Sequence, residues 1–332
     1  MSLRIGLIGA GWVTRHHLDA YRALAGRAGV VAIADPSAEA RSERAAQYGI
    51  AKTYADAAEM LAAETLDAVD IASPRELHAG HVRLAAAAGL AILCQKPLGP
   101  SFAEAEALVA EIGGRVPFMV HENWRFRPHY RQVRQWLRDA GIGRPLQVQM
   151  SVLSSGLVSD ANGELPALKR QPMLAGLGQM LVKEILIHHI DTLRFLFGEL
   201  ALRDAAVSRL SAAVIGDDHA LLSMVAADGT PVILQGNLHA RGYPGQVFDR
   251  LEIFCERGRI LLERDWLTLD AEQPQTIALD LAANYAASYR DTIAAFLDGL
   301  EAGRISENSP AENLGTLRLV DEAYARGRQR PA

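Results

Sequence analysis

Up to residue 121, short apolar runs alternate with segments in which apolar residues recur at helical spacing. Short apolar runs bounded by turn residues are typical of strands buried on both faces, and helices between them indicate βαβ units and a parallel sheet. The predicted strands cover residues 3–8, 30–34, 68–72, 91–94 and 117–121. The predicted helices cover residues 12–24, 38–48, 56–63, 76–88 and 101–112, the last capped by Ser101.

From residue 147 onward, several separate stretches show apolar and polar residues in alternation. This pattern predicts a largely antiparallel sheet with one less buried face. The strands are predicted within residues 147–152, 220–226, 232–240, 250–255, 258–263 and 266–270. Two helices are predicted at 285–300 and 310–326. The irregular stretch 154–178 contains four glycines and two prolines, and we interpret it as a substrate lid because long loops in compact domains are usually functional.

The two patterns together predict an α/β plus α+β fold. A doubly wound parallel sheet of the Rossmann type is expected in residues 1–122, and an α+β domain with a large, mostly antiparallel open sheet in residues 123–332. The last helices are expected to pack back toward the first domain. A length of 332 residues supports two domains, since single cores stop growing near roughly 250–300 residues.

The composition mainly excludes classes of function. A net charge of -5 gives no basic footprint, so nucleic acid is not an expected partner. No apolar run approaches the roughly 18 residues of a membrane helix, and no signal peptide precedes the first strand, so a cytoplasmic protein without a membrane partner is expected. Cys94 and Cys255 lie in separate apolar runs and are expected to be buried free thiols.

Candidate chemistry begins at the turn after the first strand. Gly9 can adopt the backbone angles of a sharp turn into a helix, and Gly11 has no side chain to keep a pyrophosphate away. The N–H groups of the next helix would face that pyrophosphate. Asp35 ends the second strand, where an acid binds the adenine-ribose hydroxyls. Because Thr14 replaces the third glycine or alanine of the fingerprint, a glycine-rich turn in an ordinary α/β domain is the alternative.

Ligands of a parallel sheet bind beyond the carboxyl ends of its strands, so the residues at these ends should line one crevice. The strand ends carry Gly9, Asp35, Ser73-Pro74, Gln95-Lys96 and Glu122-Asn123. The Lys96 ammonium could polarise a carbonyl or stabilise a developing alkoxide there. The alternative for any lysine is a solvated surface charge.

A second constellation lies in residues 184–191. On a helix, Glu184, His188 and Asp191 share one face, whereas His189 points about 100° away and is interpreted as structural. An imidazole one turn from a carboxylate is a candidate general base with an orienting partner. The alternatives are a helix that pairs its own charges and a metal site, although no His-Glu-x-x-His motif is present. No metal is expected.

These motifs resemble the glucose–fructose oxidoreductase, inositol dehydrogenase and MocA (Gfo/Idh/MocA) family of NAD(P)-dependent sugar and polyol dehydrogenases. The matching segments span nearly the whole chain and are Gly9-Ala-Gly11 with His17, Ala72-Ser-Pro-Arg-Glu-Leu-His78, Cys94-Gln-Lys-Pro97, Asn123-Trp-Arg-Phe-Arg-Pro128, and His188-His-Ile-Asp191 before Phe197-Gly198.

The resemblance implies that Lys96 is the catalytic lysine and that His188 takes the substrate hydroxyl proton. Three positions depart from the family pattern: Gln95 replaces Glu, Glu184 replaces Asp, and Leu186 replaces a common glycine. With Gln95, the charge next to the lysine differs from the family pattern. With Leu186, the helix that carries His188 could lie differently.

The cofactor-binding residues that follow from the loop, the crevice and the resemblance are Gly9, Gly11, Trp12, Val13, Asp35, Ser73, Pro74, His78, Gln95 and Lys96. An acid at Asp35 repels a 2′-phosphate and favours NAD, while Ser37 and Arg41 leave NADP open. The candidate substrate residues are Asn123, Arg125, Arg170 and Asp191. For the arginines near the domain junction, an interdomain salt bridge is the alternative.

The sequence therefore predicts an NAD-dependent dehydrogenase that acts on a secondary alcohol of a sugar, sugar acid or inositol-like polyol. An NAD-dependent glycosidase of the same family and a non-catalytic NAD-binding regulator are the alternatives. The expected partner is a carbohydrate or polyol. The resemblance also implies a homodimer or homotetramer formed through the open sheet face.

Overall fold

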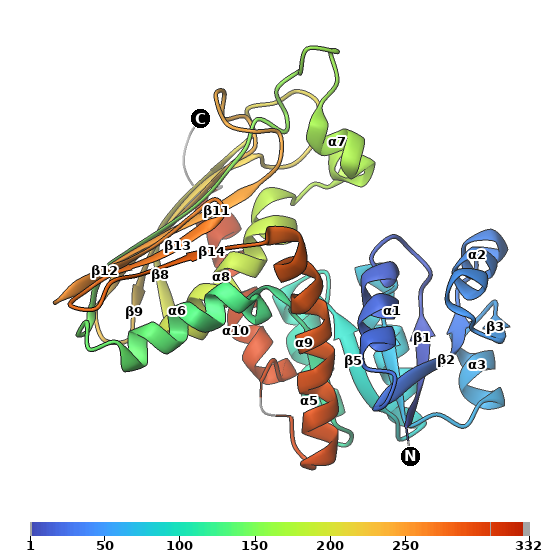
Figure 1. Ribbon diagram of the computed structural model, residues 1–332. Coiled ribbons are helices and arrows are strands. Elements are labelled where there is room, and N and C mark those ends of the chain that lie inside the picture. The colour runs from blue at the N-terminus through green and yellow to red at the C-terminus, as the bar shows by residue number, and fades with distance from the viewer. Residues whose placement is uncertain (1, 306, 328–332) are drawn as a thin grey trace. The chain divides into compact units, whose positions relative to one another are not determined.

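A computed structural model describes residues 2–305 and 307–327 of the chain (Figure 1). These residues form two compact units, one from residues 2–127 with 285–315 and the other from residues 128–284 with 316–327. Each unit is therefore built from two separate stretches of chain. The outer ends of the predicted domain ranges, residue 1 and residues 328–332, lie outside the described residues.

The first unit contains a six-stranded parallel sheet with the strand order β3-β2-β1-β4-β5-β6. Its strands are β1 (Leu3–Ile8), β2 (Ala28–Ala34), β3 (Lys52–Tyr54), β4 (Ala68–Ile71), β5 (Ala91–Gln95) and β6 (Phe118–His121). Its helices are α1 (Thr14–Ala23), α2 (Ala38–Tyr48), α3 (Ala57–Ala63), α4 (Arg75–Ala87), α5 (Phe102–Ile112), the short η1 (Trp124–Phe126) and most of α9 (Leu281–Glu301). This order is that of a dinucleotide-binding fold, with its switch point between β1 and β4. The predicted Rossmann sheet is confirmed.

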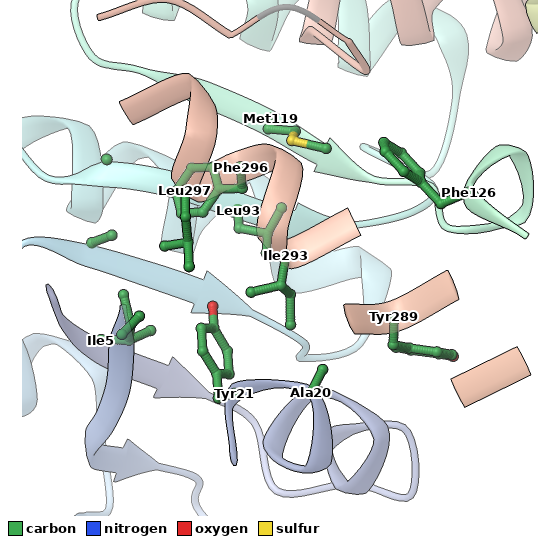
Figure 2. Close-up of a cluster of buried hydrophobic side chains, with 13 residues drawn as sticks. Ile5, Ala20, Tyr21, Leu93, Met119, Phe126, Tyr289, Ile293, Phe296 and Leu297 are labelled. Atoms are coloured by element: carbon green, nitrogen blue, oxygen red, sulfur yellow. The ribbon is translucent and has the colours of Figure 1, made fainter. Parts of the chain in front are cut away.

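One hydrophobic cluster of the first unit fills the face of the sheet that α1 and α9 cover. Figure 2 shows Ile293 and Phe296 of α9 packed with Leu93, and Tyr21 of α1 beside them. On the opposite face, a Cβ on Gly6 would lie 2.7 Å from Leu66 and 3.0 Å from the methionine of α3, so α3 packs directly on β1. Two helical layers therefore enclose the sheet and leave its strand ends for ligands.

The second unit contains an eight-stranded sheet in the order β14-β13-β12-β11-β7-β10-β9-β8, in which only β7 and β10 pair in parallel. Its strands are β7 (Pro145–Leu153), β8 (Leu200–Ser208), β9 (His219–Ala226), β10 (Pro231–Asn237), β11 (Phe248–Cys255), β12 (Gly258–Glu263), β13 (Trp266–Asp270) and β14 (Gln275–Ala278). Its helices are α6 (Pro128–Asp139), α7 (Pro166–Arg170), η2 (Pro172–Gly176), η3 (Leu181–Leu186), α8 (Ile187–Phe197) and most of α10 (Pro310–Gly327). The predicted, mostly antiparallel sheet is confirmed.

The two faces of this second sheet differ as the alternation predicts. The helices α6, α8 and α10 lie along one face of this sheet in Figure 1. Val148, Met150 and Leu234 are fully buried, and a Cβ on Gly236, on the same face of β10 as Leu234, would lie 3.0 Å from Leu186 just before α8. Gln149 and Gln235 point to the opposite face and are exposed. Because residues of a strand alternate between faces, this second face is left uncovered within the described chain.

Several elements differ from the sequence-based expectation. The elements β3, β8, β14 and α6 were not predicted, and α1 begins at Thr14 rather than at residue 12. In β8 the register shifts between Leu202 and Asp204, which breaks the period-two pattern. The irregular stretch 154–178 contains the short helix α7 and the turn η2.

Two expectations from composition can be compared with the structure. Both cysteines are buried free thiols, as predicted, and burial raises the pKa of each thiol. In the described part of the chain, no helix has the length and apolar character needed to span a bilayer.

Candidate functional site

The turn after β1 has the geometry that a dinucleotide-binding loop needs. Gly9 has a φ of 109°, and a Cβ there would lie 2.7 Å from the carbonyl oxygen of Ala72, so only glycine fits between the ends of β1 and β4. A Cβ on Gly11, by contrast, would meet no atom within 4 Å. The loop therefore leaves open space where a pyrophosphate approaches the backbone.

Thr14 takes the place of the third glycine without closing the loop. Its side chain is fully buried, and its hydroxyl donates a hydrogen bond to the Gly11 carbonyl at 2.7 Å. The helix α1 therefore starts at Thr14 with its side chain tied back to the loop. Trp12 and Val13 lie in the turn before α1, and Trp12 is half exposed.

Asp35, at the end of β2, holds the loop from the other side. One carboxylate oxygen accepts the Ala10 N–H and the other accepts the Ser37 N–H, each at 2.8 Å. Arg41 donates to the backbone carbonyl oxygens of Asp35 and Pro36. The acid that was predicted to bind ribose hydroxyls thus lies directly beside the nucleotide loop.

Lys96 follows β5 at the same edge of the sheet and is half-buried. The next residue, Pro97, is joined to it by a cis peptide bond, and the Pro97 carbonyl lies 2.9 Å from Nδ1 of His78. Nε2 of His78 lies 2.9 Å from the carbonyl oxygen of Ser73, so this buried ring connects the loops after β4 and β5. Burial lowers the pKa of His78, against the raising effect of these carbonyl groups.

Gln95 points away from the surface into a buried group of polar side chains. Its amide nitrogen lies 2.7 Å from Nε2 of His17 and 3.2 Å from Nδ1 of His121. Nδ1 of His17 lies 2.7 Å from Asp70, which is fully buried in β4. Sequence reasoning did not identify this group, although a charged residue inside the apolar run 68–72 is itself a sign of a buried partner.

In the second unit, Glu184 does not lie on a regular α-helix. Residues Leu181–Leu186 form a π-helix, and α8 begins only at Ile187. The regular α-helix that was expected to carry both Glu184 and His188 is therefore replaced by a π-helix up to Leu186, and the shared face of the two residues stays a prediction. Such segments are frequent at functional sites.

The π-helix is fixed at its start by Asp217. The carboxylate of Asp217 accepts hydrogen bonds from the N–H groups of Met180 and Val182, at 2.8 and 2.9 Å. The hydroxyl of Tyr324 donates to the same carboxylate at 2.8 Å and accepts the N–H of Lys183 at 3.2 Å. These contacts position the segment that carries Glu184.

Leu186, which replaces a common family glycine, is accommodated by a glycine elsewhere. A Cβ on Gly236 of β10 would lie 3.0 Å from the Leu186 side chain. Because Gly236 has no side chain, the sheet leaves room for the side chain of Leu186.

His188 and its neighbours on α8 have different surroundings. His188 is half-buried, and its backbone carbonyl accepts the Thr192 hydroxyl. His189 is fully buried, with Nε2 2.8 Å from Asp249 and Nδ1 3.1 Å from the Ile185 carbonyl. Asp191 is fully buried and accepts the hydroxyl of Thr316 at 3.1 Å.

The remaining predicted substrate residues of the first unit contact other protein groups. The amide of Asn123 donates to Ser288 of α9 at 2.8 Å. Arg125 is almost fully buried and forms an ion pair with Glu312 at 2.5 Å, within the first unit. The guanidinium of Arg127 lies 3.5 Å from the centre of the Trp124 ring.

Arg170, at the end of α7 in the second unit, is exposed. It lines a hollow of about 470 Å³ together with Asp160, Lys169, Pro244 and Phe248. The adjacent Lys169 forms an ion pair with Glu164 at 2.5 Å. The hollow therefore has both charged and apolar walls.

Comparison with known proteins gives matches over both units. Residues 3–115 match the model of an oxidoreductase family with an NAD-binding Rossmann fold, and residues 130–261 match the GFO/IDH/MocA C-terminal domain. D-apiose dehydrogenase from Paraburkholderia graminis is 33% identical, over 97% of this chain and 87% of the relative. Inositol 2-dehydrogenase from Rhizobium meliloti is 29% identical, over 97% of this chain and 96% of the relative.

Among solved structures, an oxidoreductase from Agrobacterium radiobacter in complex with NAD+, L-tartaric acid and magnesium is similar over almost the whole chain. The TM-score is 0.91 at 27% identity, and the match covers 99% of this chain and 97% of the other. The same fold therefore occurs in a protein that binds NAD+.

Proposed function

The chain belongs to the GFO/IDH/MocA family of oxidoreductases with an NAD-binding Rossmann fold, and from this premise we propose that it oxidises a secondary alcohol of a sugar, sugar acid or polyol. The protein is an NAD-dependent dehydrogenase. The proposal concerns its substrate class and its residues. The observation that carries it is the placement of Lys96 at the end of β5, at the same sheet edge as the Gly9 turn and Asp35.

The residues around the nucleotide loop fit the cofactor. The open space at Gly11 would admit a pyrophosphate, the N–H groups at the start of α1 would face it, and Asp35, beside this loop, would accept the ribose hydroxyls. The remaining residues proposed to hold NAD are Gly9, Trp12, Val13, Ser73, Pro74 and Lys96. When bound, NAD supplies the nicotinamide that accepts the hydride.

Two residues are proposed to act on the alcohol, and a third to support one of them. His188 removes the hydroxyl proton, since a neutral imidazole is a suitable base near neutral pH. Lys96 stabilises the negative charge that develops on the substrate oxygen. Glu184, on the π-helix before His188, orients or tunes the imidazole.

Four further residues are proposed to affect substrate binding. Arg170 is proposed to contact the substrate directly, because it is exposed and lines the hollow in the segment proposed as a lid. Asn123 and Arg125 are buried and bonded to Ser288 and Glu312, so they are proposed to fix the conformation of the loop after β6. Asp191 supports α8 through Thr316.

The test is NADH formation on a panel of aldoses, sugar acids and polyols that includes D-apiose and inositol, with NAD and NADP in parallel. Lys96→Ala and His188→Ala should each abolish turnover of the same substrate. Matched controls are Lys52→Ala, an exposed lysine of β3, and His219→Ala on the uncovered face of β9. Both control proteins should keep wild-type turnover.

Each other outcome points to a different activity. Cleavage of a glycoside without net NADH would favour an NAD-dependent glycosidase. Tight NAD binding without any turnover would favour a regulator. Full activity of Lys96→Ala would refute the catalytic assignment.

We also propose that the uncovered sheet face forms a homodimer or a homotetramer. This face carries the exposed Leu221 and Trp266 beside polar residues such as Gln149 and Gln235. Sedimentation should give a dimer or tetramer for the wild type and a smaller species for Leu221→Glu. A wild-type monomer would refute this proposal.

A further inference from the structure

The polar group around Gln95 joins four elements of the first unit. Gln95 comes from β5, His17 from α1, Asp70 from β4 and His121 from β6. Only Gln95 has any exposed surface, and that is 8%. The rings of His17 and His121 are stacked, with their centres 4.3 Å apart. The group therefore lies in the protein interior directly before Lys96.

Four titratable side chains beside this group stay neutral around neutral pH. Burial, and then the Asp70 carboxylate, raise the pKa of Tyr21 and of the Cys94 thiol well above their ordinary values. Burial, and then Tyr285, raise the pKa of Tyr289. Burial is the main cause that lowers the pKa of His16. These four side chains therefore add no charge to the group.

The hydrogen-bond geometry assigns the protons. A carboxylate only accepts, so Nδ1 of His17 carries the hydrogen toward Asp70. The amide of Gln95 has two hydrogens, and its nitrogen faces Nε2 of His17 and Nδ1 of His121. Both ring nitrogens then accept, and each imidazole is neutral. The opposite amide orientation would require a positive His17.

A glutamate at position 95, the usual residue of the family motif, would change the number of hydrogens on His17. A carboxylate cannot donate, so Nε2 of His17 would need its own hydrogen and the ring would become positive. Two carboxylates and one imidazolium have a net charge of −1, the same as one carboxylate and one neutral ring. The exchange of Glu for Gln removes a charge and a proton together.

We propose that Gln95 is a positioning residue for Lys96, held by neutral His17 and His121, and that the proton absent from His17 offsets the absent carboxylate. The buried charge beside Lys96 is then the same as with a glutamate. On the other side of Lys96, the Pro97 carbonyl is fixed by His78. Both neighbours of Lys96 are therefore held by histidine rings, and the positioning part rests on the proposed catalytic role of Lys96.

The proton content is tested by ¹⁵N NMR of the full chain with labelled histidines, with the His17 signals assigned from His17→Gln. In the wild type, His17 should show one protonated and one bare nitrogen. In Gln95→Glu, both nitrogens of His17 should be protonated. A doubly protonated His17 in the wild type, or a singly protonated one in Gln95→Glu, would overturn the charge balance. This readout needs no turnover.

The positioning role is tested by the pH profile of kcat and KM. Gln95→Leu should lower kcat at least about tenfold with little change in the KM for NAD, because the support of Lys96 is lost. Gln95→Glu should keep kcat within about threefold near neutral pH and lose it at higher pH as His17 loses its added proton. Gln135→Leu at an exposed position of α6 is the matched control.

The outcomes separate the two proposals. Wild-type kcat in a folded Gln95→Leu protein would refute the positioning role. A Gln95→Glu profile that overlays the wild type at high pH would refute the added proton. If the wild-type protein itself turns over no substrate, the proposed function fails, and the NMR measurement still decides the charge balance.

Discussion

The carboxylate of Asp35 accepts the backbone N–H of Ala10 at 2.8 Å, which ties the end of β2 to the glycine turn after β1. The residue proposed to select the cofactor thus also holds the loop proposed to bind its pyrophosphate. Changes at Asp35 should therefore alter both affinity and selectivity.

The first prediction concerns cofactor selectivity. Asp35→Ser removes the charge that repels a 2′-phosphate and leaves Arg41 close by. We expect the ratio of kcat/KM for NADP over NAD to rise by at least about tenfold, with weaker NAD binding as well. An unchanged ratio would mean that Asp35 does not reach the ribose. Asp19→Ser on the exposed face of α1 is the control.

The two glycines of the loop should respond to alanine in opposite ways. At Gly9 a Cβ would contact the Ala72 carbonyl and the backbone has a positive φ, so Gly9→Ala should destabilise the protein by about 1–3 kcal/mol. At Gly11 the Cβ has open space, so Gly11→Ala should keep the melting temperature and weaken NAD binding. Thermal unfolding and NAD titration distinguish these results. Equal loss of stability in both variants would contradict the assignment of Gly11 to the pyrophosphate.

Arg125 should matter for folding more than for substrate affinity. Its side chain is 2% exposed and paired with Glu312, which also accepts the N–H of Asn308. Arg125→Met should lower the free energy of unfolding by about 2–4 kcal/mol, since it leaves a partly buried carboxylate without this cation. Arg125→Met/Glu312→Gln should recover part of that loss. A normal melting temperature with a raised substrate KM would instead support direct substrate contact.

Stability should fall as the solution becomes acidic. Burial lowers the pKa of His16, His78 and His81 in the folded protein. As the pH falls, these histidines therefore bind protons in the unfolded chain before they do so in the folded protein. The free energy of unfolding is therefore not reduced by these histidines above about pH 6.5, and it decreases as the pH falls below that value. His78→Gln should reduce the slope of melting temperature against pH between about pH 7 and 5, whereas His219→Gln should not. The same slope in both variants would contradict the assignment to His78.

The sequence allowed the loop residues to be predicted because local rules decide them. Gly9, Gly11 and Asp35 follow from a turn and a strand end, and the capped helix α5 follows from Ser101. Features that depend on distant partners were not predictable. The π-helix depends on Asp217 and Tyr324, and the role of Gln95 depends on Asp70, which lies in another strand. Short edge strands such as β3 and β14 contain too few residues to show a period.

The anchor of the π-helix gives the last prediction. Burial, and then the Asp217 carboxylate, raise the pKa of Tyr324, so its hydroxyl stays a donor. Tyr324→Phe removes that donor and the acceptor for the Lys183 N–H, and should destabilise the protein by about 1–2 kcal/mol. Because the same segment carries Glu184, kcat should fall more than substrate affinity.

The control for this anchor is Tyr54→Phe, which removes a tyrosine–carboxylate bond to Glu64 at 2.6 Å in the first unit. It should leave kcat unchanged. If Tyr324→Phe loses stability but keeps full kcat at saturating substrate, then Glu184 keeps its position without the Asp217–Tyr324 contact, and the proposed link from α10 to the base on α8 is refuted. A fall in kcat confined to Tyr324→Phe would establish that link, because both variants remove a single hydroxyl from a carboxylate.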